Sequence, residues 1–108
     1  MSLMGVLLRS SDRVLVLGLA QCSSARLREW AAALKEGFLV GVGEEGAVRR
    51  ARRELADLDN VMFTAGSRAE IPWKEVFFTA ILDAEGGAET GEMRRVLRGD
   101  GRIYSMQP

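Results

Sequence analysis

Three small residues, Gly18, Ala20 and Cys22, alternate directly after the apolar run Val14 to Leu17. A turn made of small residues lets the backbone approach a ligand closely, and the N-terminus of a following helix attracts an anion. This combination is typical of nucleotide-binding α/β domains, in which the ligand lies across the carboxyl ends of parallel strands. The turn is therefore the first candidate binding site.

The composition excludes several other kinds of site. The chain has no His, so a zinc site or a Ser-His-Asp triad is close to impossible, and its single Cys22 cannot form an internal disulfide. Without a His base, we expect Cys22 to be a packed small residue rather than a nucleophile. Lys plus Arg and Asp plus Glu both number 15, so no overall charge attracts nucleic acid or an anionic membrane. The arginines at 49–53 are predicted to form a solvated helix face.

Length and apolar content place the chain among ordinary globular domains. It has 108 residues, of which 47% are hydrophobic and 28% charged, and we expect one domain over residues 4–108. Met1–Leu3 reads like a cloning remnant. No apolar run has the length of a membrane span and no signal peptide precedes the first strand, which favours a cytoplasmic protein.

Apolar runs alternate with amphipathic segments along the chain. The runs predict strands at 13–17, 38–43, 60–65, 76–82 and 102–106, and the amphipathic segments predict helices at 24–36, 45–58 and 90–97. The nine residues 67–75 contain Pro72, so we expect a loop or a single turn there. This alternation is typical of a parallel sheet with right-handed crossovers.

Four segments, in this order, resemble motifs of the class I, Rossmann-like S-adenosylmethionine-dependent methyltransferases. Val14 to Cys22 is similar to the family's hydrophobic-acidic-Leu-Gly-x-Gly-x-Gly, and Val40 to Glu44 to its Gly-(Val/Ile)-Asp. Gly66 to Trp73 is similar to Gly-Asp-Ala-Glu-x-Leu-Pro-Phe, and Met93 to Tyr104 to Glu-x-x-Arg-Val-Leu-(Lys/Arg)-Pro-Gly-Gly. The resemblance implies a three-layer Rossmann-like α/β fold with five parallel strands in order 3-2-1-4-5, and S-adenosylmethionine as the cofactor.

The resemblance also implies which residues would hold that cofactor. Gly18, Ala20 and Cys22 stand at the three glycine positions of the first motif. Gly43 replaces the acid that binds the ribose, and Glu44 follows it. In the third motif, the implied cofactor-binding residues are Ser67, in place of the acid that holds the adenine amino group, and its neighbour Arg68.

The departures from these motifs weaken the expected binding. Three acidic positions are absent or displaced, including Val16 in the first strand. If each lost hydrogen bond contributes about 1.5 to 3 kcal/mol, affinity falls by several orders of magnitude. We also expect the sheet to lack the family's last two strands, because no further apolar run follows the fifth strand in this sequence. Trp73 and Asp83 remain open between ligand contact and ordinary packing or loop capping.

These observations predict a non-catalytic, methyltransferase-like module. We expect it to act through protein contacts, as a homodimer through the strand-five edge or an exposed sheet face, or alongside a catalytic partner. No nucleic acid or membrane partner is expected. The alternative is a minimal S-adenosylmethionine-dependent methyltransferase that acts on an unknown small-molecule acceptor, since methyl transfer depends largely on positioning.

Overall fold

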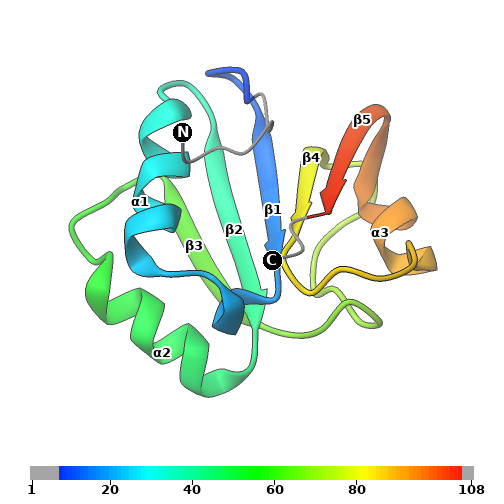
Figure 1. Cartoon of the computed structure of the whole chain (residues 1–108). Coiled ribbons are helices and arrows are strands. Elements are labelled where there is room, and N and C mark those ends of the chain that lie inside the picture. The colour runs from blue at the N-terminus through cyan, green and yellow to red at the C-terminus, as the bar shows by residue number, and fades with distance from the viewer. Residues whose placement is uncertain (1–7, 106–108) are drawn as a thin grey trace.

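The computed structural model describes residues 8–105, which form a five-stranded sheet (Figure 1). The strands are β1 (Arg13–Leu17), β2 (Phe38–Gly43), β3 (Val61–Ala65), β4 (Phe78–Asp83) and β5 (Leu97–Ser105). They are ordered β3-β2-β1-β4-β5, and every neighbouring pair is parallel. The predicted sheet and its strand order are therefore confirmed. The predicted cloning remnant at residues 1–3 lies outside the described residues.

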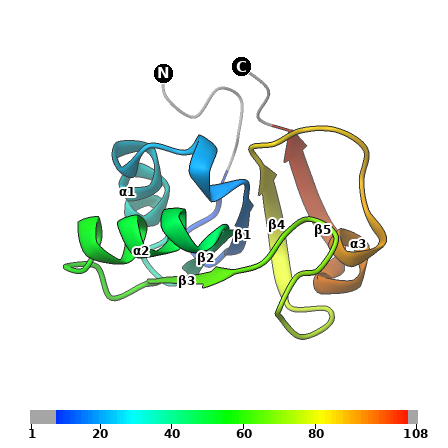
Figure 2. The same cartoon turned by 90° about the horizontal axis from the view of Figure 1, so that it is seen from below.

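Helices cover the two faces of this sheet unequally (Figure 2). The elements are the 3-10 turn η1 (Leu19–Gln21) and the helices α1 (Ser24–Ala33), α2 (Glu45–Glu54) and α3 (Gly91–Val96). Helices α1 and α2 pack on the face formed by Val14 and Val16 of β1. The opposite face, which includes Leu15 and Leu17, packs against α3 and the loop between β3 and β4.

Burial on both faces explains the unbroken apolar run of β1. Each of its residues from Val14 to Leu17 is completely buried, because the strand lies between β2 and β4 and under both layers. Parallel central strands have this pattern rather than a polar-apolar alternation. The strand ends at Leu17, directly before Gly18. The carboxyl ends of all five strands lie along the same edge of the sheet.

Several element bounds differ from the prediction. Both α1 and α2 are shorter than expected, ending at Ala33 and Glu54. Strand β5 begins at Leu97 rather than at residue 102, because Leu97 already pairs with Phe78 of β4. The predicted turn at 98–101 is therefore a bulge within β5, in which four residues lie opposite the single residue Thr79. Val76, predicted to begin β4, instead has a φ of 52° and a mostly exposed side chain, and it precedes the strand. Among residues 8–105, none of the helices is both long and apolar enough to cross a lipid bilayer.

Asp12 ties three strands together at the edge opposite their carboxyl ends. Its buried carboxylate accepts hydrogen bonds from Thr79 Oγ1 of β4 at 2.8 Å and from Arg102 of β5 at 2.7 Å. It also accepts the backbone N–H of Arg9 at 2.7 Å. Burial alone would raise the pKa of Asp12, but these three donors outweigh it and hold that pKa below its ordinary value.

We expect Asp12→Asn to lower the free energy of unfolding at pH 7 by about 2 kcal/mol. Because the folded pKa of Asp12 is lowered, the wild-type advantage is complete above the unfolded pKa of about 3.9 and disappears as the pH falls through the folded pKa. Urea unfolding of both proteins from pH 7 downward measures this difference, with Asp59→Asn at an exposed position as the control. A difference that stays constant down to acid pH would contradict the proposed role.

Candidate functional site

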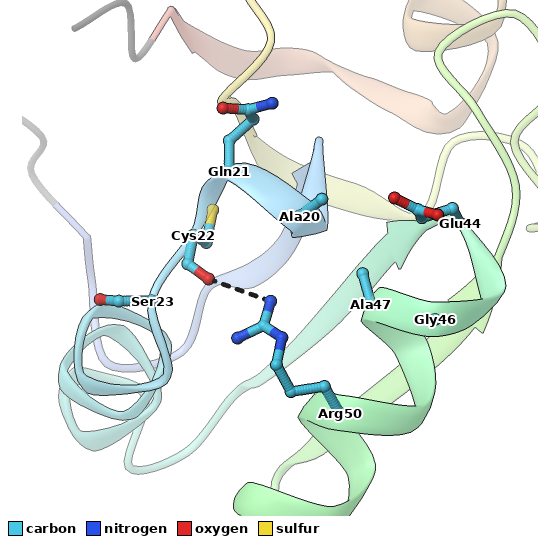
Figure 3. A pocket seen from close by; sticks show the side chains of 8 residues that line it. All are labelled: Ala20, Gln21, Cys22, Ser23, Glu44, Gly46, Ala47 and Arg50. Carbon is cyan, nitrogen blue, oxygen red and sulfur yellow. Dashed lines mark hydrogen bonds between the residues drawn. The ribbon is translucent and has the colours of Figure 1, made fainter.

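A hollow of about 410 Å³ lies between the turn after β1 and the start of α2 (Figure 3). It is lined by Ala20, Gln21, Cys22, Ser23, Glu44, Gly46, Ala47 and Arg50. Three of the predicted cofactor-binding residues are thus brought together at the carboxyl ends of β1 and β2. This is the edge of the sheet at which ligands bind in open α/β folds.

The turn after β1 is held by its own backbone and by Cys22. Gly18 has a φ of 79°, a left-handed conformation that residues with a side chain rarely adopt, and the 3-10 turn follows directly. The thiol of Cys22 lies 3.8 Å from the carbonyl oxygen of Gly18. Ser23 then caps α1 by accepting the N–H of Arg26 at 3.1 Å. The small residues therefore form a compact strand-turn-helix connection.

The Cys22 thiol is suited to packing rather than to nucleophilic attack. Burial raises the pKa of Cys22 to about 11, although the positive charges of Arg26 and Arg50 oppose this shift. At pH 7 only about one thiol in ten thousand is then ionised. We expect native Cys22 to react with iodoacetamide at least about 100-fold more slowly than in protein unfolded by urea. Equal rates, measured by mass spectrometry, would contradict this assignment.

Leu19 fills the space beside the end of β2. Its side chain is completely buried, and a Cβ atom added to Gly43 would lie 2.7 Å from the Cβ of Leu19. A Cβ added to Gly41 would lie 2.9 Å from Cδ1 of Leu19. Sequence reasoning did not single out Leu19. The alternating glycines at 41 and 43, which leave the carboxyl-terminal half of one face of β2 without side chains, could have indicated that something packs there.

Glu44 and Arg50 contribute the charges of the hollow. Glu44 precedes the first turn of α2 and is exposed, and its side chain makes no capping hydrogen bond. Arg50 extends from α2 toward the turn, where its guanidinium lies 3.5 Å from the carbonyl oxygen of Leu19 and 3.4 Å from that of Cys22. The positive charge thus lies against the small-residue turn, and the carboxylate lies at the rim.

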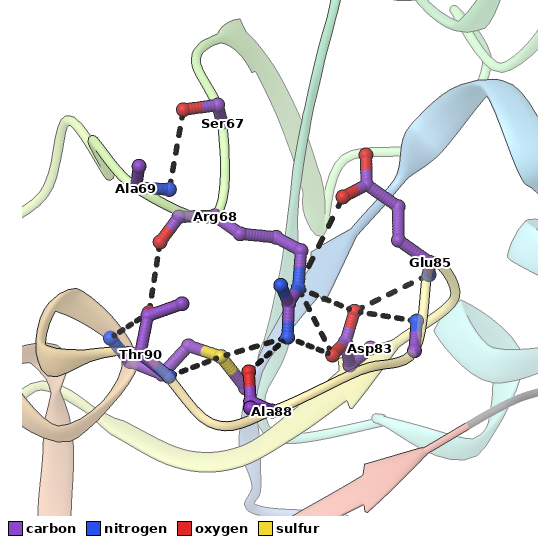
Figure 4. Close-up of polar contacts among 9 residues, drawn as sticks. Ser67, Arg68, Ala69, Asp83, Glu85, Ala88 and Thr90 are labelled. Atoms are coloured by element: carbon purple, nitrogen blue, oxygen red, sulfur yellow. Dashed lines mark hydrogen bonds and ion pairs between the residues drawn. The ribbon is translucent and has the colours of Figure 1, made fainter.

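Ser67 and Arg68 do not line this hollow (Figure 4). Ser67 is exposed, and its hydroxyl accepts the backbone N–H of Ala69 at 3.2 Å within the loop after β3. Arg68 instead reaches Asp83 at the end of β4, with its Nε at 3.2 Å and its NH2 group at 3.0 Å from Oδ2. The predicted cofactor-binding residues therefore do not form one site. Ala20, Cys22 and Glu44 line the hollow, whereas Ser67 and Arg68 lie in the loop after β3, with the Arg68 guanidinium at the end of β4.

Asp83 lies at the centre of the polar contacts that Arg68 makes at the end of β4. Its side chain is 2% exposed, and its Oδ1 accepts the backbone N–H groups of Glu85 and Gly86, both at 3.2 Å. The loop that follows returns to the first turn, since a Cβ added to Gly18 would lie 2.6 Å from Cγ of Glu85. Asp83 is therefore both a loop cap and an ion-pair partner. Trp73, the other residue left open, packs its ring against the rings of neighbouring phenylalanines, Phe77 and Phe78.

Comparison of the fold identifies solved structures with the same architecture. A putative methyltransferase from Haloferax volcanii, in complex with the Trm112 methyltransferase activator, is similar at a TM-score of 0.78 and 21% identity, over 96% of this chain and 48% of that one. YcgJ from Bacillus subtilis has a TM-score of 0.69 and 22% identity, over 88% and 43% of the two chains. A SAM-dependent methyltransferase from Aquifex aeolicus has a TM-score of 0.73 and 19% identity, over 86% and 54%.

The fold is thus that of class I methyltransferases, as the motifs predicted. This chain spans about half the length of each of these proteins. No protein-family model matches the sequence, and no curated protein does.

Proposed function

We propose that this chain is a methyltransferase-like module that acts through protein contacts and does not itself transfer methyl groups. The observation that carries the proposal is the position of Leu19, whose buried side chain packs where β2 ends in Gly43. In the resembling family this position carries the acid that binds the ribose. A Cβ atom at position 43 would already lie 2.7 Å from the Cβ of Leu19. The chain therefore lacks the ribose-binding acid, and Leu19 occupies the space in which that acid would lie.

Two further contacts support the proposal from the neighbouring strands. Glu85 lies against Gly18 at the end of β1, and the Arg68 guanidinium lies on Asp83 at the end of β4. In a sheet of this order, β1 and β4 border the crevice in which ligands bind. Side chains of this chain thus lie against the ends of both strands that border this crevice.

The second candidate is a minimal S-adenosylmethionine-dependent methyltransferase. The hollow of about 410 Å³ favours it, because this volume is in the range of small-molecule sites and Ala20, Cys22 and Glu44 line it. Against it stands the single carboxylate at its rim, where three acidic contacts are expected from the family. The acceptor of such an enzyme would be a small molecule of unknown kind.

Isothermal titration calorimetry with S-adenosylmethionine and S-adenosylhomocysteine separates the two candidates. We expect no saturable heat at ligand concentrations up to about 1 mM, which corresponds to a binding free energy weaker than about 4 kcal/mol. Gly46→Asp, which adds a carboxylate beside the hollow with open space around it, is also expected not to bind. Low-micromolar affinity of the wild-type protein would overturn the proposal and favour the enzyme.

The partner that we propose first is a second copy of the chain. Strand β5 is at one edge of the sheet formed by residues 8–105, and the thinly covered face beside it carries partly buried apolar side chains, namely Phe38, Trp73, Phe77, Leu97 and Ile103. Edges and faces of this kind favour pairing between chains. A partner resembling a methyltransferase activator is the alternative, because the Haloferax volcanii protein was solved in such a complex.

Light scattering at tens of micromolar is expected to give the mass of a dimer. Ile103→Lys on β5 is expected to give a monomer, whereas Met62→Lys on the opposite edge strand β3 is expected to leave the dimer intact. Circular dichroism verifies that both variants fold. A monomeric wild-type protein would contradict the homodimer and leave the activator-like partner as the proposal to test.

A further inference from the structure

The end of β4 holds a guanidinium group in a polar cradle (Figure 4). The group belongs to Arg68, which is 18% exposed, and it forms a forked ion pair with the buried carboxylate of Asp83. Its NH2 nitrogen also donates to the carbonyl oxygen of Ala88 and lies 3.9 Å from Sδ of Met93. The carboxylate of Glu85 lies 3.9 Å from Nε. Planar, forked pairing of this kind is specific for a guanidinium.

The segment from β4 to α3 supplies the groups that contact the guanidinium of Arg68. The N–H groups of Glu85 and Gly86 fix Oδ1 of Asp83, which also accepts from Nε of Arg68 at 3.3 Å, while Oδ2 accepts from both Nε and NH2 of that guanidinium. Gly86 and Gly87 both have a positive φ, which bends the loop around the group, and a Cβ at Gly87 would lie only 3.7 Å from the guanidinium nitrogens of Arg68. The acceptors therefore come from residues 83–93, and the occupant comes from another segment.

The occupant lies on a loop with little regular structure. Between β3 and β4 the chain forms one isolated bridge, from Ser67 to Glu70, and no helix. Hydrogen bonds hold this loop beside the cradle: the hydroxyl of Thr90 donates to the carbonyl oxygen of Arg68 at 2.8 Å, and Glu92 accepts the N–H of Ile71 at 2.9 Å. Arg95 also donates to the carbonyl oxygens of Ile71 and Trp73. If Arg68 withdraws, Asp83 is left as a buried charge without a counterion, which is strongly unfavourable. Another guanidinium could remove that penalty.

We propose that residues 83–93 form a guanidinium-binding site, in which Arg68 is the intramolecular occupant and which binds the guanidinium of another molecule when the Arg68 side chain is absent. The ligand class is an alkylguanidinium, such as the side chain of an arginine. This site shares the Arg68–Asp83 contact with the support for the proposed function, but it does not rest on the position of Leu19, which carries that proposal.

The test is chemical rescue of Arg68→Ala by methylguanidinium. We expect Arg68→Ala to have a lower melting temperature than the wild-type protein. Methylguanidinium is expected to raise that temperature saturably and, at about 20 mM, to restore at least half of the difference. That concentration is far below the molar range in which guanidinium unfolds proteins. If the variant does not fold alone, refolding with and without methylguanidinium replaces the melting experiment, and folding only in its presence supports the site.

Three controls make the result specific. Urea at the same concentration has a similar planar shape without the charge and is expected to have no effect. The wild-type protein, whose site is filled, and Arg68→Ala/Asp83→Asn, which lacks the carboxylate, are both expected not to respond. An equal response to urea, an equal response of the double variant, or no recovery and no folding of Arg68→Ala with methylguanidinium would each overturn the proposal.

Discussion

Asp83→Ala is expected to lower the free energy of unfolding by about 3 kcal/mol, in the range found when one partner of a buried ion pair is removed. The substitution removes the buried counterion of Arg68, whose guanidinium is only 18% exposed, and leaves it the half-exposed carboxylate of Glu85 at 3.9 Å. It also deprives the N–H groups of Glu85 and Gly86 of their acceptor. Urea unfolding at pH 7, followed by circular dichroism, measures the loss.

Two variants determine whether the loss comes from the stranded charge. Arg68→Met/Asp83→Leu removes both charges and keeps apolar volume, so we expect it to be more stable than Asp83→Ala. Glu89→Ala removes an acid from the same loop whose partner, Arg94, is highly exposed, and it is expected to change stability by less than about 0.5 kcal/mol. A double variant as unstable as Asp83→Ala would mean that the loop capping, and not the ion pair, stabilises this end of β4.

The sheet could be predicted from sequence because its cause is local. Val14 to Leu17 and the central residues of β2 are apolar without alternation, and the structure buries both faces of these segments. Such runs, separated by helical periodicity, leave few arrangements other than a parallel sheet. The strand order came from the resemblance of four motifs, since no local pattern determines which strands are neighbours.

Element ends were harder to predict because contacts distant in sequence determine them. The turn at 98–101 was expected to precede β5, but Leu97 already pairs with Phe78, so the turn is a bulge within the strand. Gly101 permits this fold-back, because a Cβ there would lie 2.5 Å from Cδ1 of Leu97. A glycine-rich turn looks the same in the sequence whether it precedes a strand or interrupts one.

The ion pair between Arg68 and Asp83 at the end of β4 could not be predicted for a related reason. Arg68 was aligned with an alanine beside the adenine-binding acid, yet its side chain spans to a carboxylate fifteen positions later. Spacing along the chain does not indicate such a pairing when the intervening segment is a loop. The cofactor-binding roles of Gly18, Ala20 and Cys22 stay predictions. The structure places Ala20 and Cys22 beside Glu44 in the lining of one hollow.

Gly43→Asp, which restores the family's acid, is expected to destabilise the protein by about 2 to 3 kcal/mol and to confer no cofactor binding. Its Cβ would lie 2.7 Å from Cβ of Leu19 and 3.3 Å from the backbone nitrogen of Leu19, so the turn must move. Overpacking against a buried side chain such as Leu19 has a cost of this size. Gly46→Asp in the same hollow has no neighbour closer than 4.0 Å and is expected to change stability by less than about 1 kcal/mol.

A double-mutant cycle tests whether Leu19 is the cause. Leu19→Gly removes the obstructing side chain and, as a fully buried leucine, should alone lower stability by more than about 3 kcal/mol. In combination with Gly43→Asp the losses should be less than additive by at least about 1 kcal/mol, because the aspartate then has room. Additive losses would mean that Leu19 does not obstruct position 43. Calorimetric binding of S-adenosylmethionine by the double variant, but not by either single variant, would show that this leucine excludes the cofactor.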